Sequence, residues 1–183
     1  LVYCGDGSVE DDMTGQTKRH VDATVELLSN ELHLSVNRFT ARESQAEREV
    51  LLDEFESGDL QALVAIRCLD EGIDVPATKT AYVLASSSNP RQFVQRRGRI
   101  LRQHHNKDHA VIHDFVVAPP SMSGGTMSDD EFKSERRLVQ KELERVNLFS
   151  EAARNHPDDD VPGLPTSSGS LSELKTRYNL RQF

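Results

Sequence analysis

The sequence predicts an α/β fold, with a mostly parallel β-sheet flanked by helices and a helical extension after it. Two observations lead to this prediction. Residues 61–66 and 80–85 are continuous apolar runs, as expected of parallel strands covered on both faces. Amphipathic helical patterns alternate with such runs at the spacing of right-handed β-α-β units. We therefore expect ligands to bind at the carboxyl ends of the strands.

The N-terminal part of the chain begins with a short apolar run, Leu1 to Cys4, which predicts a buried strand. The turn-prone sequence Gly5-Asp6-Gly7-Ser8 follows it. Apolar residues then recur at helical spacing and predict an amphipathic helix over about Thr17 to Leu32. Its apolar stripe consists of Val21, Val25, Leu28 and Leu32. Residues 34–39 are the second predicted strand.

The next helix is predicted from its start and stop signals. Thr40 and Glu43 match a capping box, in which each side chain satisfies a backbone donor at a helix start. The helix should run to Phe55, and Gly58 should stop it. The side chains expected to face the core are Ala46, Val50, Leu51 and Phe55.

Residues 61–66 and 80–85 form the third and fourth predicted strands. Asn89 and Pro90 then form a helix-start signal, because asparagine can cap an orphan N–H and proline suits the first helical position. This predicts a helix from Pro90 to Gly98. A fifth strand is predicted at residues 110–117.

The predicted domain organisation divides the chain at a segment rich in proline, serine and glycine. Residues 1–118 form the α/β domain, residues 119–128 a linker and residues 129–183 a helical extension with a flexible segment. A long helix is expected from Asp129 to Asn155, with a loop-like segment over 156–170. Residues 171–183 are expected to form a short helix or a disordered end. The stripe of the long helix comprises Phe132, Val139, Leu143, Val146, Phe149 and Ala153.

Composition sets broad limits on function. The chain has 183 residues, of which 36% are hydrophobic and 28% charged, and no apolar run is as long as a membrane span. With two cysteines and no signal-peptide pattern, we expect a cytoplasmic protein without a disulfide framework or a membrane partner. The net charge of −8 argues against general affinity for nucleic acid. It does not exclude a small local binding face.

Arginines are concentrated between Asn89 and Arg102, in an otherwise acidic chain. At helical spacing, Gln95, Arg99 and Arg102 fall on one side of this segment. Gly98 indicates that the two arginines lie on the last helical turn or just beyond it. Two guanidinium groups beside an amide suit a polyphosphate, because their planar forks match phosphate oxygens. The alternative is a solvated basic helix.

The segment after the third strand, residues 67–76, carries the acidic residues Asp70, Glu71 and Asp74. A strand followed by acidic residues is similar to a magnesium-binding carboxylate site. However, the sequence contains no G-x-x-x-x-G-K-[ST] phosphate loop. This absence argues against an independent nucleotide hydrolase.

Three segments together resemble motifs of the second RecA-like domain of superfamily 2 helicases and translocases. Residues 1–4 resemble motif IV, residues 65–76 motif V and residues 95–102 motif VI, in the family's order over about residues 1–118. The Gln-Arg-x-Gly-Arg-x-x-Arg form, with residues 71–74 upstream, is more similar to the restriction-subunit and excision-repair-like branch than to DEAD-box RNA helicases. The resemblance implies a RecA-like fold for the α/β domain.

The resemblance also implies a divided ATP site. Arg99 and Arg102 would act as arginine fingers on ATP, which with Mg²⁺ is bound mainly by an N-terminal RecA-like domain of the same full-length protein. Gln95 would face the γ-phosphate, and Gly72 and Asp74 would approach the ribose. The fragment alone is then expected to be inactive. An arginine finger can raise the rate of phosphoryl transfer by about 10³ to 10⁵.

Nucleic acid, with DNA expected, is the second implied partner. The candidate contacts are Gly5, Thr40 and Arg67. Two of the candidate site residues have alternative roles: Thr40 is first a helix cap, and Asp74 could instead form a turn.

Histidines 104, 105, 109 and 113 form no recognisable metal motif, so no metal site is predicted. The alternative function for the whole chain is a non-catalytic adaptor that binds nucleic acid or protein through its arginine face.

Overall fold

The structure is a computed structural model that describes residues 1–10, 15–66, 75, 78–84, 98–105, 107–117, 119, 128–150, 153–154, 168–180 and 182. The chain divides into two compact units, Leu1–Phe115 and Val116–Phe183. The predicted limits of the domain, linker and extension remain predictions. The predicted helix over Pro90 to Gly98 lies outside the described residues except at Gly98.

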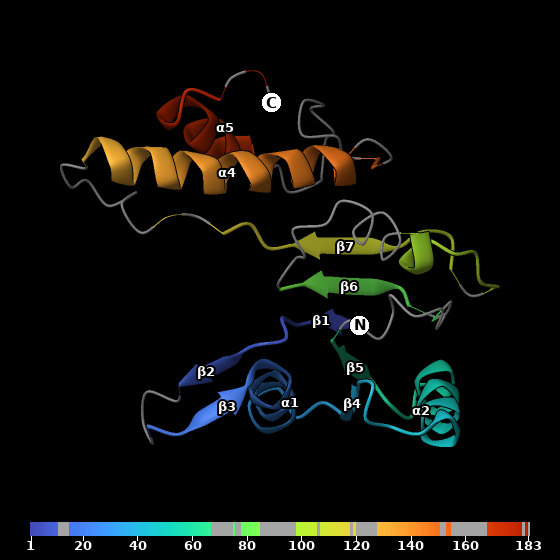
Figure 1. The fold of residues 1–183 in the computed structure, drawn as a ribbon. Coiled ribbons are helices and arrows are strands. Elements are labelled where there is room, and N and C mark those ends of the chain that lie inside the picture. The colour runs from blue at the N-terminus through green and yellow to red at the C-terminus, as the bar shows by residue number, and fades with distance from the viewer. Residues whose placement is uncertain are drawn as a thin grey trace. The chain divides into compact units, whose positions relative to one another are not determined.

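The first unit is built on a sheet that, within the described residues, has five strands in the order β4-β5-β1-β6-β7 (Figure 1). All neighbouring strands in it are parallel. Its strands are β1 (Val2–Tyr3), β4 (Val36–Phe39), β5 (Ala62–Ala65), β6 (Thr80–Val83) and β7 (Val111–Asp114). These strands lie within the five segments predicted from the sequence, which confirms the α/β fold with a parallel sheet.

The two faces of the sheet bury different side chains because successive residues of a strand point in opposite directions. One cluster joins Val2, Cys4 and Val64 to Val21 of helix α1 (His20–Asn30). The other face packs against helix α2 (Gln45–Ser57) and contains Tyr3, Phe39, Leu51, Leu60, Leu63, Ala65, Ala81, Val83 and Ile100. Helices therefore cover both faces.

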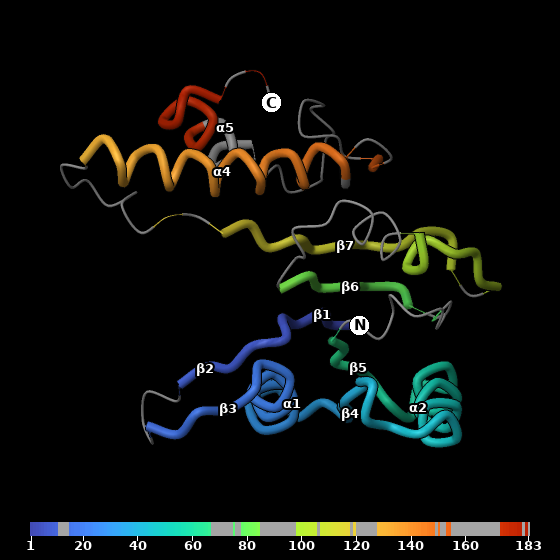
Figure 2. The backbone as a smooth tube through the Cα atoms, viewed as in Figure 1, coloured from blue at the N-terminus to red at the C-terminus, as the bar shows by residue number. Residues whose placement is uncertain are grey.

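A pair of antiparallel strands precedes α1, and this pair was not predicted from the sequence. Strands β2 (Ser8–Glu10) and β3 (Thr17–Arg19) pair in antiparallel fashion, and Figure 2 shows the chain passing through them between β1 and α1. The predicted helix over Thr17 to Leu32 is therefore wrong at its start. Residues 17–19 obtain their hydrogen bonds from β2, and the buried helical stripe begins only at Val21. At the other end Leu32 is 59% exposed.

Helix α2 also starts later than predicted. Thr40 and Glu43 form a turn, in which Glu43 Oε2 accepts from the Thr40 N–H at 2.6 Å and from its hydroxyl at 2.8 Å. The true capping box is Ser44 with Glu47. This box satisfies backbone N–H donors four residues further along the chain than predicted, so helix α2 can form without a cap at Thr40. The predicted stop is confirmed, since Gly58 ends α2 with a φ of 91°.

The predicted inward face of α2 is only partly right. Leu51 is buried and Phe55 packs against the core, as predicted. Val50 is 56% exposed and Ala46 is also exposed. The helix is rotated so that Leu52, rather than Val50, joins the core cluster.

The second unit contains helices α4 (Asp129–Ser150) and α5 (Ser168–Arg177). Its core is formed by Val139, Leu143, Leu174, Tyr178 and Leu180. Helix α4 is shorter than predicted, and Ala153 beyond it is exposed. Helix α5 begins inside the segment predicted to be a loop. Of the helices in the described part of the chain, none is long and apolar enough to span a membrane.

Candidate functional site

The candidate site is centred on a short helical turn at residues 98–100. Arg99 is half-buried within this turn, while Arg102 follows it and is exposed. The Arg102 N–H donates to the Arg99 carbonyl oxygen at 3.4 Å, so the two residues are one turn apart. Ile100 lies between them and is 1% exposed, in the core beneath the sheet. Burial of Ile100 thus fixes the backbone that carries both arginines.

Lys107 also anchors this turn. Its Nζ donates to the carbonyl oxygen of Ile100 at 2.8 Å and to that of Thr78 at 3.2 Å. The last carbonyls of a helical turn have no partner within the helix, and a positively charged donor is well suited to them. Lys107 therefore connects the arginine turn to the segment that enters β6. This role of Lys107 could not be predicted from the sequence, because nothing in the local pattern around Lys107 indicates it.

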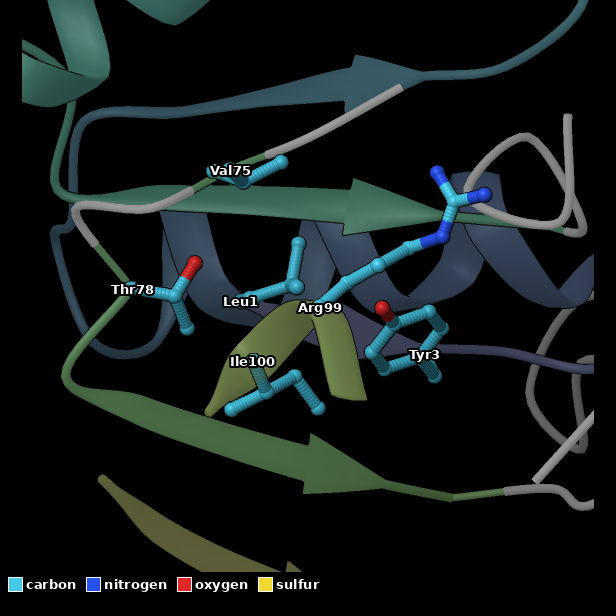
Figure 3. A pocket seen from close by; sticks show the side chains of 6 residues that line it. All are labelled: Leu1, Tyr3, Val75, Thr78, Arg99 and Ile100. Carbon is cyan, nitrogen blue, oxygen red and sulfur yellow. The ribbon is translucent and has the colours of Figure 1, made fainter. Parts of the chain in front are cut away.

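Arg99 lines a narrow crevice between the arginine turn and the sheet (Figure 3). The other lining residues are Leu1, Tyr3, Val75, Thr78 and Ile100. In this view the Arg99 side chain extends toward the carboxyl ends of the strands. Ligands of parallel sheets bind at those ends. The arrangement therefore presents the guanidinium group of Arg99 at the edge where a ligand is expected.

Two predicted nucleic-acid contacts lie at the same end of the sheet. Gly5 follows β1 and is half-buried, and Thr40 follows β4 and is buried. Strand β5 lies between β1 and β4, so two strand spacings, about 10 Å, separate the two positions. The Thr40 hydroxyl is bonded to Glu43 in the turn described above. A role for Thr40 as a helix cap is therefore wrong.

Charge near Thr40 is balanced rather than strongly basic. Asp22 on α1 accepts hydrogen bonds from Arg19 at 2.8 and 3.1 Å and from Arg38 at 2.8 Å. The hydrogen bonds from Arg19, with that from Arg38, hold the pKa of the Asp22 carboxyl below its usual range. Each arginine is thus partly neutralised by this carboxylate.

The remaining predicted site residues, Gln95, Gly72, Asp74 and Arg67, lie outside the described residues. Of the described ones, the structure brings Arg99 and Arg102 together on one turn. It places Gly5 and Thr40 at the same edge of the sheet. A further cluster of Glu56, His104 and His105 was not predicted. The sequence signals this cluster only through the two adjacent histidines, because Glu56 lies far from them in the chain.

Comparison with known proteins identifies the family. The profile described as "Helicase conserved C-terminal domain" matches residues 13–104. A DNA 3'-5' translocase XPB2 of Sulfurisphaera tokodaii is 42% identical over 64 residues, which are 35% of this chain and 15% of that protein. A putative DNA 3'-5' helicase Rad25 of Halobacterium salinarum is 43% identical over 100 residues, covering 54% of this chain and 15% of that protein.

Among solved structures, the yeast DEAD-box splicing factor Prp28 has the same fold. Its TM-score is 0.54 at 17% identity, and the match covers 100% of this chain and 32% of the Prp28 chain. This likeness confirms the RecA-like arrangement of the parallel sheet. The matched profile, which spans half of the chain, shows that the chain belongs to the helicase conserved C-terminal domain family of superfamily 2 helicases and translocases.

Proposed function

We propose that this domain is the C-terminal motor half of an ATP-dependent DNA helicase or translocase. It contributes Arg99 and Arg102 to an ATP site, and an N-terminal RecA-like domain of the same longer protein completes that site. The match covers only 15% of the length of each of the two relatives described above. The sequence also lacks a phosphate loop of its own. Both facts support a site shared between two domains.

The observation that supports this proposal most strongly is the anchoring of the arginine turn. Ile100 is buried in the core, and Lys107 binds the Ile100 carbonyl oxygen, so the backbone that directly follows Arg99 is fixed. A donor that is already oriented needs no reorganisation when charge develops in a transition state. A solvated basic helix, the alternative reading of this segment, would need neither contact.

The chemistry of the two side chains fits a polyphosphate. Arginine remains charged at all physiological pH values, and its planar fork matches two phosphate oxygens. ATP, with its Mg²⁺, supplies the phosphoryl group when bound, and the arginines stabilise the charge on that group. In this proposal Gln95 contacts the γ-phosphate, while Gly72 and Asp74 approach the ribose.

DNA is the proposed track, bound through Gly5, Thr40 and Arg67. Gly5 and Thr40 lie at the carboxyl ends of β1 and β4, where a strand of nucleic acid could cross the sheet edge. Two relatives are named as a DNA translocase and a DNA helicase, which supports DNA over RNA. Because the Thr40 N–H and hydroxyl both donate to Glu43, a phosphate would have to replace that carboxylate.

The test compares the isolated 183-residue chain with the longer protein. We expect the isolated chain to show no ATPase activity, while the longer protein hydrolyses ATP in the presence of DNA. Specific ATPase activity that copurifies with the isolated chain would contradict the shared site. If the longer protein binds DNA with steep salt dependence and no effect of ATP, the adaptor function is correct instead.

A further inference from the structure

Three potential metal ligands come together beside the arginine turn. Glu56 lies near the end of α2, and His104 and His105 follow the turn in the chain. Their ligand atoms all lie within 4.8 Å of one another. His104 Nε2 is 3.1 Å from Glu56 Oε1, and the centroids of the two imidazole rings are 4.2 Å apart. Residues from two separate elements thus converge on one small volume.

We propose that Glu56, His104 and His105 form a binding site for a transition-metal ion, with Zn²⁺ as the preferred occupant. Two imidazole nitrogens and one carboxylate oxygen are a donor set typical of zinc sites. Magnesium and calcium favour sites made only of oxygen ligands, so this set disfavours them. The site is distinct from the arginines, which face a nucleotide in the proposed function.

The distances require little adjustment to hold zinc. Tetrahedral zinc, with bonds of about 2.0 to 2.2 Å, places its ligand atoms roughly 3.3 Å apart. The His104–Glu56 pair is already at 3.1 Å. The His105 ligand atom lies within 4.8 Å of the other two, and the side chains of His105 and Glu56 are exposed, so they can adjust to the metal. The His104 side chain is only 12% exposed, so it serves as the fixed ligand.

Backbone contacts support the position of His104. The His104 carbonyl oxygen accepts from the Lys107 N–H at 3.0 Å, and Lys107 Nζ in turn binds the carbonyl oxygen of Ile100. A metal held by Glu56 and His104 would therefore link α2 to the segment that carries Arg99. Bound metal should stiffen this segment and raise the stability of the folded chain.

A simple hydrogen bond between His104 and Glu56 is the competing explanation for their short distance. It accounts for that pair but gives His105 no role. The two explanations therefore differ in what happens when His105 is replaced. Metal binding should depend on His105, whereas the His104–Glu56 hydrogen bond should not.

The test is calorimetric titration of ZnCl₂ into the chelator-stripped 183-residue chain, with His105→Ala and Glu56→Gln as variants. His109→Ala is the matched control, because His109 is an exposed histidine of the same unit outside the cluster. We expect wild type and control to bind one equivalent with equal affinity. Loss of a direct ligand in either variant should lower the zinc affinity by more than the roughly 10- to 100-fold typical of losing an outer-shell partner.

Imidazole nitrogen chemical shifts provide an independent readout, because a thiol elsewhere in the chain also attracts zinc. Zinc should shift the ring nitrogens of His104 and His105 and leave those of His109 unchanged. Glu56→Gln preserves side-chain size at an exposed position, so it tests the site even if His105→Ala fails to fold. Equal zinc affinity in wild type and Glu56→Gln, no zinc binding by wild type, or unshifted His104 and His105 nitrogens would overturn the proposal.

Discussion

Lys107 Nζ lies 2.8 Å from the carbonyl oxygen of Ile100, the residue that follows Arg99. The same ammonium group lies 3.2 Å from the carbonyl oxygen of Thr78, just before β6. One side chain thus connects the arginine turn to the sheet. In the proposed function, this contact orients the guanidinium group of Arg99 without touching the nucleotide.

The first prediction concerns this contact. Lys107→Met should destabilise the isolated chain by about 1.5 to 3 kcal/mol, the usual worth of a hydrogen bond to a charged group. In the longer protein it should lower kcat for ATP and leave nucleotide affinity nearly unchanged. Urea denaturation and steady-state kinetics measure the two effects. Lys133→Met, whose side chain is 65% exposed in the second unit, is the control. Wild-type kcat in Lys107→Met would show that the contact does not position Arg99.

The second prediction compares two neighbours on the arginine turn. Ile100 is 1% exposed and Leu101 is 44% exposed, although both are large aliphatic residues. Ile100→Ala should lower the free energy of unfolding by about 2 to 5 kcal/mol, because it leaves a cavity in the core. Leu101→Ala should change it far less. Equal losses in the two variants, measured by urea denaturation, would mean that Ile100 does not anchor the turn.

The third prediction concerns the pH dependence of stability through Asp22. Because its pKa is lowered in the folded state, Asp22 stabilises the fold above its unfolded pKa of about 3.9. This contribution is lost as the pH falls through the folded-state pKa. Asp22→Asn should therefore be less stable than wild type at pH 7, by about 0.5 to 1 kcal/mol, and the difference should shrink in acid.

Urea denaturation at pH 7 and at about pH 3 measures this difference. Asp53→Asn serves as the control, because Asp53 is an exposed carboxylate of α2 that pairs with no arginine among the residues that the structure describes. A destabilisation of Asp22→Asn that is the same at both pH values would exclude the ion pairs with Arg19 and Arg38 as its cause.

The fourth prediction concerns the Glu43 carboxylate, which accepts hydrogen bonds from the Thr40 N–H and hydroxyl. If a DNA phosphate replaces Glu43 at the Thr40 N–H and hydroxyl, Glu43→Gln should increase the affinity of the chain for single-stranded DNA. Removal of a nearby negative charge also favours a polyanion, so Glu49→Gln, an exposed residue of α2, controls for charge alone. Binding titrations at two salt concentrations are the measurement. If Glu49→Gln increases the affinity for single-stranded DNA as much as Glu43→Gln does, Thr40 is not the specific phosphate contact.

Sequence patterns predicted the central strand β5 well because a continuous apolar run is a signal contained within one segment of the chain. Residues 62–65 illustrate this, since all four are buried in β5. Arg99 and Arg102 could also be placed near a helical turn, because Gly98 and the spacing of the arginines are local signals. The local sequence therefore predicted the sheet and the arginine turn.

Features that depend on distant residues could not be predicted in the same way. The predicted start of α1 was wrong because residues 17–19 form β3, which pairs with β2. Strand β2 could not be predicted, because the side chains of Ser8–Glu10 are exposed and form no apolar pattern. The rotation of α2 about its axis is set by the packing of Leu52 against the core cluster, whereas Val50 is exposed. Both residues are apolar, so the sequence pattern could not show which of them faces the core. Likewise, Lys107 and Glu56 reach the arginine segment only through the tertiary fold.

The most direct test of the shared ATP site is the ATPase activity of the longer protein carrying Arg99→Ala or Arg102→Ala. Arginine fingers contribute about 10³ to 10⁵ in rate, so each variant should lose nearly all DNA-stimulated turnover. Nucleotide binding, measured by fluorescence titration of an ATP analogue, should stay close to wild type because the other domain holds the phosphates. Wild-type turnover in both variants would contradict the central claim that these arginines complete the ATP site.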